Sequence, residues 1–154
     1  MACGRQAPQL EVRTLTLPPP SPASPATTAR ILHASLAASA AVLTAVAWVF
    51  RGSLPLPDGA GGAVTFAAYA LAASGLIAGL AFRRLIPERT AAQPADAWWR
   101  QHLPKAVAVW AIGEGTVLIG ALVFAVGGQV IAAIAVVLAG LGVLVATAPG
   151  RLVP

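Results

Sequence analysis

The sequence has little charge and almost no cysteine. Only 10% of its 154 residues are charged and 58% are hydrophobic, whereas soluble domains carry roughly 25% charged residues. Polar side chains this scarce cannot cover a folded surface in water. The composition therefore excludes an ordinary soluble domain and indicates a chain that lies in lipid. The single cysteine, Cys3, cannot form an internal disulfide, and the sequence has no CxxC or Cys/His cluster.

Catalytic signatures are missing as well. The sequence contains no HExxH motif, and we find no Ser/His dyad and no aspartate pair in it. The net charge is +5, but the basic residues border apolar runs, which is typical of membrane proteins rather than of nucleic-acid binding. We therefore expect no enzymatic activity, no cofactor or metal, and no nucleic-acid partner.

Long apolar runs are what the sequence does have. Four of them cover residues 31–50, 63–82, 106–126 and 130–148. A helix of about 20 residues at 1.5 Å per residue spans about 30 Å, the thickness of a bilayer core. The sequence therefore predicts an all-α fold, with one membrane domain (31–151) of four transmembrane helices in an antiparallel bundle.

The segments outside these runs differ in character. Residues 1–30 are rich in proline and predict a disordered tail, because proline removes backbone donors and fixes φ. Residues 83–104 form the one substantial polar loop. Asp96 could cap a short helix that leads through Trp98 and Trp99. We expect this pair in the headgroup layer, as an interfacial collar or as the pre-membrane turn of the third helix, and we expect His102 to be solvated.

Basic residues flank the apolar runs unevenly. Of the ten Lys and Arg residues, Arg51 alone lies in the loop between the first two helices. Because positive loops stay on the cytoplasmic side, we expect a multi-pass protein of the bacterial inner (plasma) membrane with both termini in the cytoplasm. The other nine are Arg5, Arg13, Arg30, Arg83, Arg84, Arg89, Arg100, Lys105 and Arg151.

Small residues recur at helical spacing within the runs. Such residues let neighbouring backbones approach closely inside a membrane, and a GxxxG step is one form of the pattern. The expected helix-packing glycines are Gly75, Gly79, Gly113, Gly120, Gly127 and Gly142.

One acid interrupts the apolar runs. Glu114 stands between Gly113 and Gly115, and a charged residue at mid-helix costs about 2.5–3.5 kcal/mol on insertion scales. Ser39 and Ser74 fall near the same depth when each helix is measured at 1.5 Å per residue. No Lys or Arg shares that layer, so we expect a protonated carboxyl that donates a hydrogen bond to Ser39, Ser74 or a backbone carbonyl.

Three interpretations of Glu114 stay open. It can tie helices together, which suits a structural or accessory subunit of the membrane. It can be a proton or cation site with Ser39 and Ser74, which suits an ion-handling protein. It can also bind a polar group of another subunit or a lipid. The expected partners are therefore the lipid bilayer and either further copies of the chain or a larger membrane complex.

The last third of the chain carries a resemblance. A central Gly-Glu-Gly, a run to Val-Gly-Gly and a close on Pro-Gly-Arg resemble a loosely defined group of uncharacterised small bacterial membrane proteins with four helices. The resemblance covers about 106–151 and implies a four-helix membrane fold without a specific activity. The matching residues are Glu114, Gly120, Gly127, Gly128, Pro149 and Arg151.

The hairpin of the third and fourth runs also looks faintly like the proteolipid ring subunit of rotary ATPases. In that family a membrane carboxylate carries a proton or sodium ion, a role that the likeness would give to Glu114. The chain departs from that family in two ways. Its acid is on the third helix, and its turn at 127–129 lacks the Arg-Gln-Pro loop.

Overall fold

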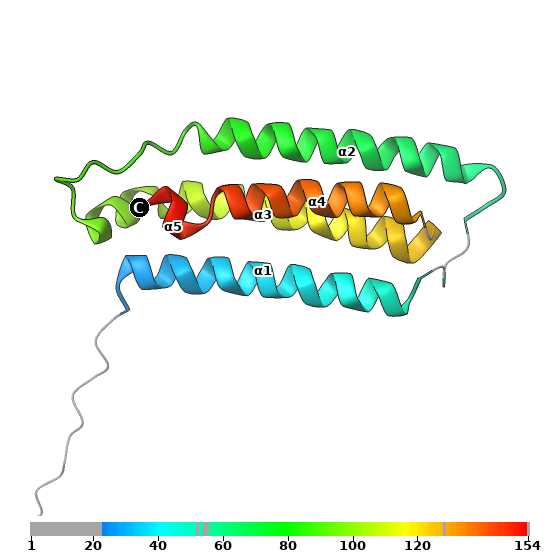
Figure 1. Ribbon diagram of the computed structural model, residues 1–154, viewed down its shortest axis with the longest axis horizontal. Coiled ribbons are helices and arrows are strands. Elements are labelled where there is room, and N and C mark those ends of the chain that lie inside the picture. The colour runs from blue at the N-terminus through cyan, green and yellow to red at the C-terminus, as the bar shows by residue number, and fades with distance from the viewer. Residues whose placement is uncertain (1–22, 52, 54–55, 128, 154) are drawn as a thin grey trace, which may run out of the picture.

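The computed structural model describes residues 23–51, 53, 56–127 and 129–153. Within these residues the chain is helical and has no strand, which confirms the all-α prediction. Three helices are long and apolar enough to cross a membrane, and a fourth apolar helix is shorter. The elements, which run antiparallel in chain order (Figure 1), are α1 (Pro25–Val49), α2 (Ala60–Arg83), α3 (Ala95–Gly127), α4 (Val130–Ala146) and α5 (Pro149–Leu152).

Helix α1 begins six residues before the predicted start at Ile31. Ser24 is the N-cap and its side chain accepts from the Thr27 backbone N–H at 3.3 Å. Pro25 occupies the first turn, where its missing N–H needs no partner. The Ser-Pro pair is therefore a helix start, although prolines in this segment suggested a tail. The rest of the predicted disordered tail, residues 1–22, lies outside the described residues.

Helix α3 begins at Ala95, so the predicted loop 83–104 is shorter than expected. The helix continues through Pro104, where a helix start after the proline was predicted. Its 33 residues extend about 50 Å, well beyond the roughly 30 Å of a bilayer core. One end of α3 therefore carries a helical extension outside any single membrane crossing.

The remaining helix ends differ less from prediction. Helix α2 begins at Ala60 and ends at Arg83, one to three residues outside the predicted 63–82. Helix α4 ends at Ala146 rather than at 148, because Thr147 takes a non-helical conformation. The single turn of α5 follows and contacts α1.

Helix α3 is the centre of the fold. It packs against α1, α2 and α4, and α2 also packs against α4. Helices α1 and α2 therefore lie on opposite sides of the α3–α4 pair (Figure 1). Half of the most apolar stretch of α3 is buried, against 11% of that of α1.

An aromatic cluster fills the end of the fold where α1 and α3 begin, which we call the basic end. Trp98 and Trp99 are 1% and 2% exposed and His102 is 6% exposed. They pack with Trp110, and the rings of Trp98 and His102 lie 4.9 Å apart. The predicted solvated histidine is therefore wrong, because the helical extension of α3 turns these side chains into the fold. The predicted helix through Trp98 and Trp99 is confirmed and is continuous with α3.

Candidate functional site

Three neighbouring positions of α3 face three different helices. Consecutive residues of an α-helix are about 100° apart around its axis. A Cβ on Gly113 would meet Leu144 and the backbone of Gly140 on α4, whereas Glu114 meets Ser39 on α1. Thr116 lies against Gly75 on α2. The sequence around Glu114 is therefore the junction at which all four long helices meet.

Glu114 is half-buried and bonded to α1. The hydroxyl of Ser39 donates to Glu114 Oε1. The same hydroxyl oxygen lies 3.0 Å from the carbonyl oxygen of Leu36, one turn earlier in α1. The predicted partners Glu114 and Ser39 therefore come together across the α1–α3 interface.

Ser74, in contrast, does not join this layer. It is exposed, and its hydroxyl donates to the carbonyl oxygen of Ala70 at 2.8 Å within α2. Thr116 marks the side of α3 that faces α2, and it is about 200° around the helix from Glu114. Ser74 was predicted to lie beside Glu114 because the two residues have a similar depth along their helices. They lie apart because α2 packs on a different side of α3 from the one that carries Glu114.

His33 and Trp110 bind the last turn of α4, a role that sequence analysis missed. His33 Nε2 lies 3.0 Å from the carbonyl oxygen of Leu144, and the Trp110 indole N–H donates to Thr147 O at 2.8 Å. The last carbonyls of a helix lack partners within the helix, so both side chains satisfy groups that lipid cannot. A histidine inside an apolar run was the available signal, but its partner is 111 residues away.

The predicted packing glycines lie in different environments. Gly75 and Gly79 of α2 lie against Thr116 and Val143, and Gly127 lies against Leu56. A Cβ on Gly120 would be 2.7 Å from Val137 and 3.0 Å from the carbonyl oxygen of Ala133.

Gly142 of the predicted packing stripe faces no other helix of this chain among the described residues. It is exposed, and no described atom would lie within 4 Å of a Cβ there. Gly140, two residues earlier, is buried, and its Cβ would be 2.5 Å from the carbonyl oxygen of Gly113. The two glycines are about 200° apart on α4, so one faces α3 and the other faces outward.

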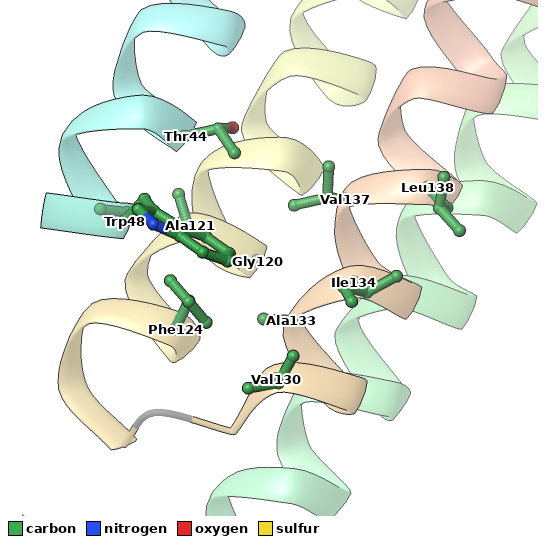
Figure 2. A pocket seen from close by; sticks show the side chains of 11 residues that line it. Thr44, Trp48, Gly120, Ala121, Phe124, Val130, Ala133, Ile134, Val137 and Leu138 are labelled. Carbon is green, nitrogen blue, oxygen red and sulfur yellow. The ribbon is translucent and has the colours of Figure 1, made fainter. Parts of the chain in front are cut away.

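An apolar groove runs along α3 between α1 and α4. Two hollows of about 150 and 430 Å³ form it, and they share Thr44, Trp48 and Val137 as lining residues. Figure 2 shows Trp48 of α1 lying over Gly120 and Ala121 of α3, with side chains of α4 on the opposite wall. Trp48 also stacks on Phe124 with ring centroids 5.2 Å apart.

The geometry offers little for metal chemistry. Among the residues that the structure describes, no group of three or more His, Cys, Asp and Glu side chains could hold a metal ion. Glu114 therefore stands with Ser39 as an isolated polar contact inside an apolar interface.

Comparison with known proteins adds no family to this geometry. No protein-family model, no curated protein and no solved structure matches the chain. The resemblances to small bacterial four-helix membrane proteins and to proteolipid ring subunits therefore stay predictions.

Proposed function

We propose that this chain is a structural or accessory subunit of a membrane assembly, in which Glu114 ties α1 to the rest of the fold. All four apolar helices cross the bacterial inner membrane in this proposal, with both termini in the cytoplasm. The uneven distribution of basic residues supports that orientation. The partners are the lipid bilayer and either further copies of the chain or a larger complex.

The contact between Ser39 and Glu114 carries the proposal. Glu114 is the one charged residue inside the apolar runs, and its carboxyl is used across the interface between α1 and α3. Neither hollow of the groove is lined by it. A side chain that is already engaged by a neighbouring helix suits a tie better than a site that exchanges ions.

The test is a double-mutant cycle on Ser39 and Glu114 in micelles, measured as the free energy of unfolding in SDS. Ser39→Ala and Glu114→Ala should each cost about 0.6–1.7 kcal/mol, the range for hydrogen bonds between membrane helices. The double variant should cost little more than either single one. Glu114→Gln should be close to wild type, because its amide oxygen can still accept a hydrogen bond from Ser39.

Proton or cation handling by Glu114 is the second candidate function. The observation that favours it is a carboxyl within a membrane-length helix, which is a functional candidate by default. It predicts that Glu114→Gln abolishes ion flux into liposomes while the fold stays intact. If the unfolding free energies lost in Ser39→Ala and Glu114→Ala add in the double variant, the two side chains do not stabilise the fold through their contact. That result, together with sodium-dependent changes in the Glu114 carboxyl infrared band, would favour ion handling over the structural role.

A further inference from the structure

The groove between α1 and α4 has one closed end and one open end. At the closed end His33 of α1 lies 3.0 Å from the carbonyl oxygen of Leu144 in the last turn of α4. Toward the other end Trp48 of α1 and Ile134 of α4 line the opposite walls of the hollow, over a floor of α3 (Figure 2). The two helices are therefore bonded near the basic end, and the apolar groove lies between them toward the other end.

The groove accepts an apolar occupant. Its polar lining groups are the hydroxyl of Thr44 and the indole N–H of Trp48. The Thr44 hydroxyl donates to the carbonyl oxygen of Ala40 at 2.8 Å in the same helix. The other lining residues are Ala, Gly, Val, Leu and Ile with the two aromatic rings of Trp48 and Phe124. The larger hollow, about 430 Å³, is within the usual 300–1,000 Å³ of ligand sites.

The length of the groove is close to the depth of one leaflet. Its α1 wall runs from Ala40 to Trp48, which is about 12 Å at 1.5 Å per residue. Arg51 follows just after the end of α1 at Val49, so it lies beyond this wall. Half of a bilayer core is about 15 Å, so an acyl chain whose headgroup lies level with Arg51 would end near Ala40.

A cation stands at the open end of this groove. The guanidinium of Arg51 lies 5.4 Å from the ring centroid of Phe124, which lines the groove. Arg51 is exposed, so its guanidinium can also reach a group outside the fold. A guanidinium binds phosphate with paired hydrogen bonds, so the charge at the mouth complements an anionic headgroup.

We propose that this groove binds an anionic phospholipid, with its phosphate at Arg51 and one acyl chain along α3 between α1 and α4. Apolar walls, a depth of one leaflet and a cation at the open end all suit this ligand. The lipid fills the space that α1 and α4 leave between them, so it completes the interface at the end opposite the basic end.

Quenching of Trp48 by brominated lipid tests the proposal. Trp48 is 65% exposed, whereas Trp98, Trp99 and Trp110 are buried, so the difference between the full chain and Trp48→Phe isolates its emission. The chain is reconstituted in phosphatidylcholine vesicles that contain dibrominated phosphatidylglycerol or, for comparison, dibrominated phosphatidylcholine. We expect phosphatidylglycerol to quench Trp48 at least threefold more effectively at equal mole fraction.

Two variants and one matched control locate the site. Arg51→Gln should remove the preference for phosphatidylglycerol, and Ala45→Phe should weaken quenching by both lipids because Ala45 lines the groove. Arg84→Gln, an exposed arginine at the opposite end of the fold, should keep the preference. If Arg51→Gln fails to fold, high salt should still weaken the preference of the unmodified chain.

Three outcomes overturn the proposal. Equal quenching by the two brominated lipids means ordinary contact with the bilayer. A preference that survives in Arg51→Gln removes the headgroup site. Trp48 that neither lipid quenches, in a chain that cross-links as a dimer, means that a second copy covers the groove.

Discussion

Helices α4 and α1 both pack on α3, but by different means. Helix α4 approaches at backbone distance, where a Cβ on Gly140 would be 2.5 Å from the carbonyl oxygen of Gly113. Helix α1 is held at its start and middle by side-chain hydrogen bonds, which are made by Asp96, His33 and Ser39. Between its middle and its end α1 borders the groove.

The difference shows two ways to join helices in lipid. Apolar contact alone adds little there, because lipid tails are as apolar as the side chains that they replace. Close backbone packing and hydrogen bonds therefore decide which helices stay together. The α3–α4 pair uses close backbone packing along its length, with one hydrogen bond from Trp110 to Thr147 at its end. Helix α1 relies on hydrogen bonds, so its interface should be the more easily altered.

Replacing Gly140 should have the largest effect on the stability of the fold. In Gly140→Ala the new methyl group would meet the Gly113 carbonyl and the Val117 backbone nitrogen, 2.5 and 2.7 Å away. Such overpacking costs about 1–3 kcal/mol. Gly142→Ala is the matched control on the open side of α4 and should stay within about 0.5 kcal/mol of wild type. Unfolding in SDS, followed by circular dichroism, measures both, and equal costs would contradict the assigned face.

Removing the His33 hydrogen bond should have an intermediate effect. His33→Phe keeps a ring against Trp110, 5.1 Å away in the wild type, but leaves the Leu144 carbonyl without its side-chain donor. The expected loss is about 1 kcal/mol. His33→Gln retains a donor and should recover part of it. A Phe variant as stable as wild type would mean that this bond does not hold α1.

Asp96 should contribute least. Its Oδ1 accepts from the backbone N–H of Ala26 at 3.3 Å, one of the first-turn amides that a helix cannot satisfy itself. Asp96→Ala should cost about 0.5 kcal/mol and speed hydrogen exchange at Ala26, without change in α4. Asp96→Asn keeps an oxygen acceptor and should exchange at nearly the wild-type rate. Faster hydrogen exchange throughout α3 and α4 would show that α1 does not open independently of these two helices.

The positions of the helices follow from sequence more closely than their contacts do. Apolar runs of bilayer length predicted the four long helices to within a few residues at most ends. The larger errors came from prolines, since Pro25 begins α1 and Pro104 lies inside α3. A proline in a sequence can mark the start of a helix or lie inside one, and the packing around it decides between these two positions.

The contacts around Glu114 show what sequence analysis cannot predict for single residues. Depth along the helices brought Ser39 and Ser74 to the level of Glu114, and the structure joins only the first of them to it. Depth follows from 1.5 Å per residue, but the angle at which a helix faces its neighbour needs the whole fold. The burial of Trp98, Trp99 and His102 was missed for the same reason.

The sequence by itself determined that this chain is helical and apolar enough for a membrane, and that one acid lies among its apolar runs. Those properties depend on local hydropathy and helix length, which are contained in the order of residues along the chain. The tertiary structure decided that α3 is central, that Gly140 rather than Gly142 faces it, and that an apolar groove lies between α1 and α4. These features depend on the rotation of each helix about its axis, which is set by contacts between residues far apart in the chain.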